Sequence, residues 1–285
     1  MFQKLLSAAV LALGLIYAAV ILRALYKNKR AFDEANGCLL VTGICEFAVF
    51  AISCFGISDF LMNTLAAKRF RLADDKELPP SLVVCTVVPS SIIASRLIAG
   101  SESFGLSTLL ICGGAVMLGS AAGSRIVTGL DGAKIKSIMR AALIASLGFL
   151  IVKMILSSGA PGTLTELSGA RLAAAAVICF FCGVLNMFGI PMKPTWTALF
   201  MIMGLSPISV LTMVLVLGAL APLSGAAGLI RAGIYQKKMA GSAVIAGSAG
   251  ALLGTSLAVS IPQTLLNVIL IAVMLIAIAS MFKKS

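Results

Sequence analysis

The chain contains no histidine and a single tryptophan, and charged residues make up only 11% of its 285 positions. The absence of histidine removes the usual metal ligand and the side chain that titrates nearest neutral pH. The shortage of charge excludes an ordinary soluble domain, in which roughly a quarter of the residues are charged. Acidic residues are especially few, with 10 Asp and Glu against 22 Lys and Arg, and they form no acidic metal cluster.

Motifs for nucleotide-driven or hydrolytic chemistry are also missing. The sequence has no Walker A loop and no Gly-x-Ser-x-Gly elbow. Its seven cysteines lie within or beside apolar segments, which does not fit a secreted disulfide framework. Cys179 and Cys182 have Cys-x-x-Cys spacing, but without a second pair we favour packing over redox or metal chemistry. We therefore expect no enzymatic activity, no cofactor and no metal.

Long apolar runs dominate what is present. Hydrophobic residues make up 60% of the chain, whose mean hydropathy is +1.10. A helix of about 20 apolar residues crosses a bilayer, so the sequence predicts an all-α polytopic membrane protein. Its net charge of +12 lies mostly in short loops, which favours the positive-inside rule over nucleic-acid binding. The expected apolar segments are 5–22, 38–56, 81–98, 106–124, 138–156, 172–189, 207–230, 239–257 and 264–281.

Two of these segments end in similar interruptions. The stretch FGISDFLMNTL begins at Phe55, and FGIPMKPTWTAL begins at Phe188, 133 residues later. Each turns polar where an apolar run should continue, and the apolar pieces that follow, 60–67 and 196–205, are too short to span a bilayer. Each interruption therefore predicts a broken helix that turns back as a re-entrant hairpin.

Loop charge predicts how the chain is threaded. If the basic clusters are cytoplasmic, the N-terminus lies outside, the C-terminus lies inside, and each half has one hairpin and three crossings. Three is odd, so the second half is inverted relative to the first. The expected units are 1–37 (an extra helix and basic loop), 38–157 (repeat 1), 158–171 (an external linker) and 172–285 (repeat 2 and a basic tail).

Internal similarity supports two repeats. Pro89 and Ser91 match Pro222 and Ser224 at the same offset of 133, and GSAAGS (119–124) resembles GALLGT (250–255). Inverted repeats with broken helices are typical of secondary transporters, whose substrates bind where the breaks meet. The paired prolines and serines either line the pore or kink packed helices.

The breaks offer groups that suit an oxyanion, since helix N-termini present free N–H groups and positive partial charge. Ser58 or Asp59 can cap the first half-helix, and Pro194 suits the first turn of the second. Lys193 either contacts the anion or extends to the outer surface. The candidate substrate-binding residues are Gly56, Ser58, Asn63, Thr64, Gly189, Lys193, Thr195 and Trp196, together with Pro89, Ser91, Pro222 and Ser224.

Glu46 is the acidic residue that we expect deepest inside a span. Acids within the membrane are costly and are functional by default. Glu46 therefore carries a coupling proton, pairs with Arg96, or lies nearer the cytoplasmic face than its segment suggests.

The paired breaks, half-helices and G-x-x-x-G faces, clearest in FFCGVLNMFGIPMKPTWTALFMIMGLSP, resemble the sulfite exporter TauE/SafE family, also called the toluene sulfonate uptake permease (TSUP) family. The resemblance covers residues 38–281, although each break here has a single glycine where the family has a Gly-rich run. It implies a multi-pass carrier in a bacterial or archaeal plasma (inner) membrane. The implied substrates are sulfite, organosulfonates such as sulfoacetate, or related organic anions.

We therefore expect an exporter of sulfur-containing anions that works by alternating access. Its expected partners are the small anion and the lipid bilayer, without nucleic acid, and a homodimer is left open. Three alternatives remain: an importer of an inorganic anion such as thiosulfate that uses membrane cysteines, a membrane enzyme acting on lipid-linked substrates, and a passive channel.

Overall fold

The computed structural model describes residues 2–33, 35–74, 77–100, 105–129 and 162–260. The expected spans 138–156 and 264–281 therefore lie outside the described residues. The described part is helical, and its one bridge between extended segments joins Leu164 to Leu205. The helices are α1 (Phe2–Lys27), α2 (Lys29–Asp33), α3 (Leu39–Ser53), α4 (Asp59–Phe70), α5 (Leu78–Gly100), α6 (Leu106–Thr128), α8 (Gly169–Asn186), α9 (Lys193–Ile202), α10 (Pro207–Ala232), α11 (Lys237–Ser242), the π-helical turn η1 (Ala243–Gly247) and α12 (Ser248–Ser260).

Six stretches in the described part are long and apolar enough to cross a membrane. This confirms the expected class, a multi-pass helical membrane protein. Helix α3 is apolar but has only 15 residues. The six stretches are Gln3–Lys27, Leu78–Gly100, Leu106–Thr128, Gly169–Asn186, Pro207–Ala232 and Lys237–Leu257.

The two predicted breaks are present and have the same backbone turn. In each, a glycine N–H donates to the carbonyl of the last residue of the preceding helix: Gly56 to Ser53 at 3.1 Å, and Gly189 to Asn186 at 3.0 Å. The two glycines have φ of 84° and 78°, a left-handed conformation that costs other residues roughly 1–2 kcal/mol. The turn thus requires glycine at both positions.

Short helices follow both breaks, as predicted. Helix α4 has 12 residues and α9 has 10, so they are about 18 and 15 Å long and too short to span a bilayer. Ser58 caps α4 by accepting a hydrogen bond from the Leu61 N–H at 3.4 Å, which settles the capping residue in favour of Ser58. Helix α9 begins at Lys193, earlier than the expected 196–205, because Pro194 fits a first helical turn.

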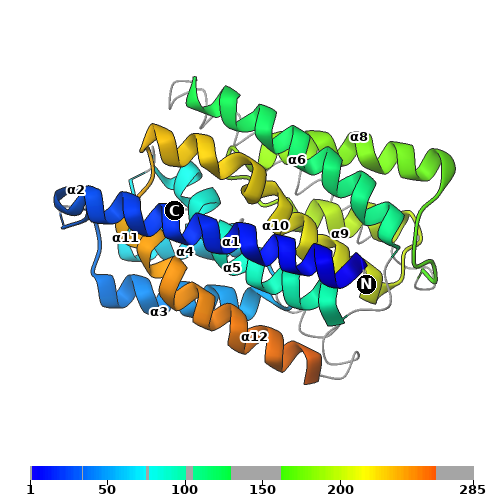
Figure 1. Ribbon diagram of the computed structural model, residues 1–285, viewed down its shortest axis with the longest axis horizontal. Helices are drawn as coiled ribbons and strands as arrows, with labels where there is room; N and C mark the ends of the chain where they lie inside the picture. Colours follow the sequence, from blue (N-terminus) through cyan, green and yellow to red (C-terminus); the bar gives the residue numbers. More distant parts are fainter. Residues whose placement is uncertain (1, 34, 75–76, 101–104, 130–161, 261–285) are drawn as a thin grey trace.

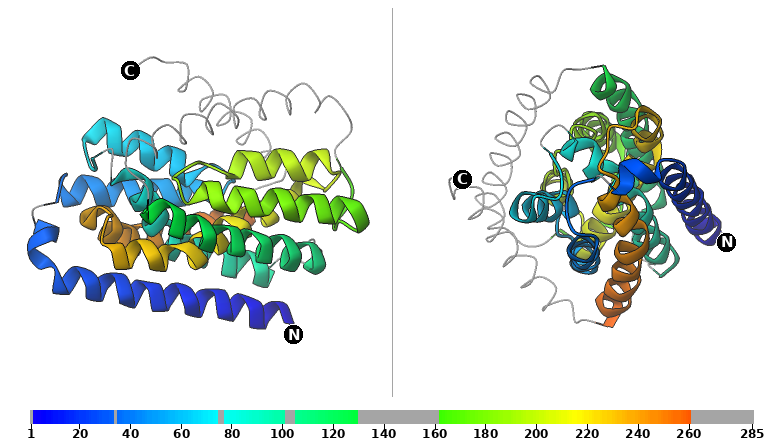
Figure 2. Two further views of the ribbon diagram at one scale, coloured as in Figure 1. Left: turned by 90° about the horizontal axis from the view of Figure 1, so that it is seen from above. Right: turned by 90° about the vertical axis from the view of Figure 1, so that its left-hand side faces the viewer.

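The two hairpins, α3–α4 and α8–α9, open toward opposite ends of the molecule (Figures 1 and 2). At the base of the first, the Asn36 amide donates to Asp74 at 3.2 Å, and Gln236 donates to the Asn36 carbonyl at 2.6 Å. At the base of the second, the Leu164 N–H donates to the Gly204 carbonyl at 3.1 Å. The closed tips of the hairpins therefore point toward each other inside the protein.

Each hairpin packs against a helix from the other half of the sequence. Helix α6 packs on α8 and α12 packs on α3, while α5 and α10 pack together between them and α1 lies along the outside against α5 (Figures 1 and 2). Glycines permit the close approach of the first two pairs, since a Cβ atom would strike the facing backbone. Gly119 and Gly123 face Phe180 and Val184, and Gly250 and Gly254 face Phe47 and Ala51.

The facing residues are themselves related by the repeat offset. Phe180 lies 133 positions after Phe47, and Val184 lies 133 after Ala51. The same backbone positions of α3 and α8 thus receive the same kind of glycine contact from α12 and α6.

Candidate functional site

A buried ion pair joins the tips of the two hairpins. The Lys193 ammonium, in the first turn of α9, lies 2.7 Å from Asp59 Oδ1, in the first turn of α4. Lys193 is only 4% exposed and Asp59 only 2%. The interpretation that Lys193 extends to the outer surface is therefore wrong, because its charge is held between the breaks.

The remaining contacts of Lys193 also come from the first hairpin and from α10. Its ammonium donates to Ser53 Oγ at 2.8 Å and to the Ile57 carbonyl at 3.4 Å. A Cβ atom at Gly218 would lie 3.1 Å from Lys193 Cε, so the glycine makes room for the lysine stem. Lys193 belongs to the second hairpin, whereas the polar partners of its ammonium group all belong to the first.

Asp59 is held by a second contact on its other side. The Thr86 hydroxyl of α5 donates to Asp59 Oδ2 at 2.9 Å, so both carboxylate oxygens are occupied. A negative charge in the first turn of α4 is favoured by the helix dipole, whereas the positive charge of Lys193 in the first turn of α9 is opposed by it. The Asp59 carboxylate thus offsets an unfavourable charge at the start of α9.

Glu46 belongs to an adjacent buried group. It is 1% exposed, and its Oε2 accepts a hydrogen bond from the Asn63 amide at 3.3 Å. The suggested pairing with Arg96 is wrong, because the Arg96 guanidinium donates to α12 at Leu252 O (3.0 Å), Thr255 Oγ1 and Ser256 Oγ. How near Glu46 lies to the cytoplasmic face stays a prediction, and Asp59 joins it as a second deeply buried acid.

Several buried polar atoms around the breaks have no hydrogen-bond partner. In the first turn of α9 these are the Thr195 hydroxyl and the Trp196 indole N–H, both potential donors to an anion. Around Glu46 they are its second oxygen, Oε1, and the Asn63 carbonyl oxygen, both acceptors when Glu46 is ionised. Thr64 has no free hydroxyl proton to offer, since it donates to the Phe60 carbonyl of its own helix at 2.7 Å.

The two predicted prolines lie inside α5 and α10 and are buried. A helical proline leaves the carbonyl four residues earlier without its usual donor. For Pro89 this is the carbonyl of Cys85, whose thiol lies beside Glu46. For Pro222 it is the carbonyl of Gly218, which packs on Lys193. Each proline therefore follows, by one helical turn, a residue that lies beside Glu46 or Lys193.

Their partner serines have other roles. The Ser91 hydroxyl donates to the Val87 carbonyl at 2.6 Å, and Ser224 donates to Ala221 at 3.0 Å. A Cβ atom at Gly14 would clash with Ser91, so Ser91 lies against α1. The structure does not bring these two serines to the ion pair.

The cysteines, including the Cys-x-x-Cys pair, lie within the part of the chain that the structure describes. All seven are free, and no described group of His, Cys, Asp and Glu could hold a metal ion. The Cys179 thiol interacts with Cys112 of α6, and Cys182 is 4% exposed. Both cysteines of the Cys-x-x-Cys pair therefore pack inside the helix bundle.

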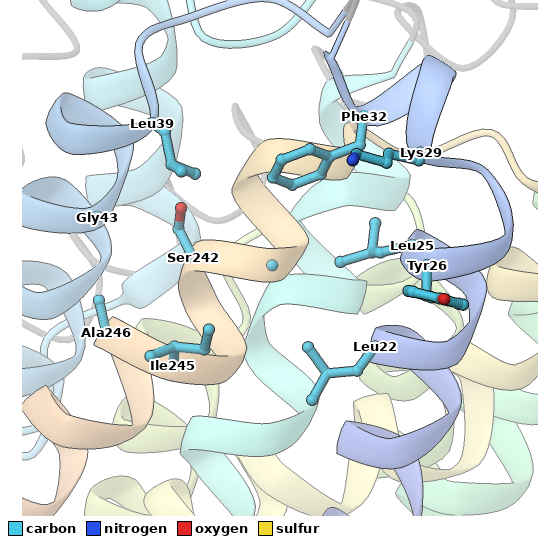
Figure 3. A pocket seen from close by; sticks show the side chains of 11 residues that line it. Leu22, Leu25, Tyr26, Lys29, Phe32, Leu39, Gly43, Ser242, Ile245 and Ala246 are labelled. Atoms are coloured by element: carbon cyan, nitrogen blue, oxygen red, sulfur yellow. The ribbon is translucent and has the colours of Figure 1, made fainter.

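An apolar pocket of about 490 Å³ lies away from these groups (Figure 3). It opens between α1, α3 and the α11–η1 segment, and it is lined by Leu22, Leu25, Phe32 and Ile245, with Lys29 at its edge. None of its lining residues belongs to a break. Its apolar surface does not suit a small anion.

Comparison with protein families, with curated proteins and with solved structures found no match. The fold itself defines a multi-pass helical membrane protein, and none of these comparisons assigns it to a family.

Sequence reasoning missed three contributors to the ion pair. Asp59 was expected only as a possible helix cap, and neither Ser53 nor Thr86 was expected at the site. A usable signal was present, because Asp59 is one of only 10 acidic residues and lies within a break.

Proposed function

We propose that this protein is a secondary transporter, and specifically an exporter, of small sulfur-containing anions. The observation that supports this most is the buried Lys193–Asp59 pair, which joins two broken helices from distant parts of the sequence. In secondary transporters, broken helices meet at the substrate site near the middle of the membrane. An isolated structural ion pair would not need two glycine turns of the same geometry beside it.

The repeat relationship is part of the proposal. Two hairpins opening toward opposite ends, one shared turn geometry and the reciprocal α6–α8 and α12–α3 contacts are what two inverted repeats would produce. We propose that the repeats rock about the paired breaks, so that the ion pair is reached alternately from each side of the membrane. In the described conformation the pair is closed to solvent, since both residues are buried.

The chemistry of the site favours an oxyanion. Lys193 supplies a full positive charge, and Thr195 and Trp196 add unpaired donors in the same helical turn. Sulfonate and sulfite oxygens accept such hydrogen bonds. The choice of sulfur anions over carboxylates rests on the family resemblance, whose breaks and G-x-x-x-G faces the chain shares.

Flux measurements on purified protein in liposomes test this proposal. We expect uptake of labelled sulfite or sulfoacetate to be accelerated by an unlabelled anion on the opposite side, because a carrier exchanges substrate across the membrane. A passive channel would give flux without such acceleration. Parallel measurements with taurine and thiosulfate define the substrate, and thiosulfate transport lost on Cys179→Ser and Cys182→Ser would favour the cysteine-dependent importer instead.

A further inference from the structure

We propose that the Asp59 carboxylate occupies the anion site in the empty transporter, and that one proton binds to Asp59 whenever the substrate anion replaces it on Lys193. This inference rests on the proposed function and adds its coupling ion. In the exchange, the proton goes to Asp59 and the Lys193 ammonium changes partner from the carboxylate to the sulfonate. No covalent bond other than the new O–H bond is made or broken.

Charge balance is the first argument. In the described state one buried cation, Lys193, faces one buried anion, Asp59, at 2.7 Å. Adding a monovalent anion alone would leave a net negative charge in a buried site, which is strongly unfavourable. A proton on Asp59 restores neutrality, with Lys193 and the bound anion as the new pair.

The surroundings of the pair are the second argument. Asp59 lies at the positive end of α4, and Lys193 lies at the positive end of α9. When Asp59 is neutral, the lysine charge and two helix N-termini remain together without the Asp59 counter-charge, which favours anion binding. Met192 provides no capping side chain to α9, so an anion would meet no competitor there.

Lys193 and Asp59 each have polar contacts that do not depend on the ion pair. Ser53 and the Ile57 carbonyl hold the Lys193 ammonium from the first hairpin, independently of Asp59. Thr86 faces the far oxygen of Asp59, and its hydroxyl can act as donor or acceptor, so it can hydrogen-bond to both the ionised and the neutral carboxyl group.

The titratable groups that face Asp59 come from two elements, α3 and α9. Lys193 approaches from α9, Glu46 acts on it from α3, and the Cys54 thiol lies at the end of α3. Glu46 was the expected proton carrier, but it hydrogen-bonds to the neutral Asn63 amide and does not hold the lysine. A proton on Glu46 would therefore not release Lys193, whereas a proton on Asp59 would.

Calorimetry of ethanesulfonate binding to the detergent-solubilised full chain tests the proposal, since this probe stays anionic at every pH used. Heats measured in two buffers of different ionisation enthalpy give the number of protons taken up. We expect one proton per anion, and an affinity that falls about tenfold for each pH unit of increase between about pH 5 and pH 8, because the complex holds one more proton than the free protein.

Two variants distinguish Asp59 from Glu46 as the group that takes up the proton. Asp59→Asn should bind ethanesulfonate without proton uptake and without pH dependence, and Glu46→Gln should keep the uptake of one proton. Proton uptake that persists in Asp59→Asn, or its absence in the unmodified protein, would overturn the coupling while leaving anion transport standing. Failure of the unmodified protein to bind at any pH would refute the proposed function and this inference with it.

Discussion

Burying the Lys193–Asp59 ion pair costs free energy, and leaving one of its two charges buried without the other costs more. Both side chains are at most 5% exposed, so either charge left alone would lack solvent. Removing one member of a buried pair costs about 3–5 kcal/mol, whereas replacing both by neutral groups of similar size is often neutral. The stability of charge variants therefore reports whether the pair is intact in the protein.

We predict that Lys193→Met and Asp59→Asn each lower the thermal unfolding temperature, and that the double variant recovers most of the loss. Thermal unfolding of detergent-solubilised protein, followed by intrinsic fluorescence, measures this. Glu166→Gln provides a matched control, because Glu166 pairs with Ser107 at 2.9 Å in an exposed position. Double-variant losses equal to the sum of the single losses would mean that the two charges do not interact.

The contact between Lys193 and Asp59 could not be predicted from the sequence. The internal offset aligns Lys193 with Phe60 and Asp59 with Met192, so the repeats gave no signal that these two charges meet. Their contact depends on how two hairpin tips face each other, which is a tertiary property. The glycines of the breaks could be predicted, because a left-handed turn in an apolar run leaves a local pattern of Gly followed by polar residues.

Among the elements, the two broken helices restrict most strongly which residue can stand at a given position. Gly56 and Gly189 both have positive φ, and a Cβ atom at Gly189 would also lie 2.9 Å from Pro79 Cα. Leucine at either glycine would strain the backbone as well as fill the turn, because both positions have positive φ. Alanine is the more informative replacement.

We predict that Gly189→Ala destabilises the protein more than Gly233→Ala. Gly233 has a similar φ of 69°, but nothing lies within 4 Å of its added Cβ. Gly233→Ala thus measures the backbone strain alone, about 1–2 kcal/mol, and the excess at Gly189 measures the contact with α5. Unfolding temperatures give both values, and equal losses would contradict the close approach of the second break to α5. Reduced anion binding by Gly56→Ala and Gly189→Ala would connect the turns to the site.

The glycine faces of α6 and α12 lead to a paired prediction. Gly119→Leu should separate α6 from α8, and Gly250→Leu should separate α12 from α3, because each side chain would strike a facing carbonyl. Gly114→Leu on α6 is the control, since nothing lies within 4 Å of that position. Size-exclusion profiles and unfolding temperatures should change for the first two variants and not for the third. Similar losses at Gly119 and Gly250 would fit the repeat relationship, and a large loss at Gly114 would show a general effect of bulk.

For the protein as a whole, the helical membrane class followed from composition, and the structure confirms it. The inverted orientation of the repeats and their placement in the membrane stay predictions. What the structure adds is a division into two ends. Asn36, Asp74 and Gln236 meet at one, and Leu164, Thr165 and Gly204 meet at the other.

The distribution of charge predicts which end lies on which side of the membrane. Lys27, Lys68, Arg125, Arg231 and Lys238 lie at or near helix ends on the side of Asn36, whereas the residues around Thr165 are poor in basic charge. The positive-inside rule then predicts that Asn36 lies in the cytoplasm. It also predicts an external N-terminus, because α1 runs from the opposite end toward α2 (Figure 1).

Labelling of single cysteines in a cysteine-free background tests this orientation. We expect Asn36→Cys and Lys237→Cys to react with a membrane-impermeant maleimide only after the cells are opened, and Glu102→Cys and Thr163→Cys to react in intact cells. Pairs are used at each end because one unreactive cysteine can simply be buried. Reaction of all four from the same side would refute the opposed hairpins, and with them a substrate site shared by two inverted repeats. Reversed accessibility would keep the repeats and place the basic end outside, against the positive-inside rule.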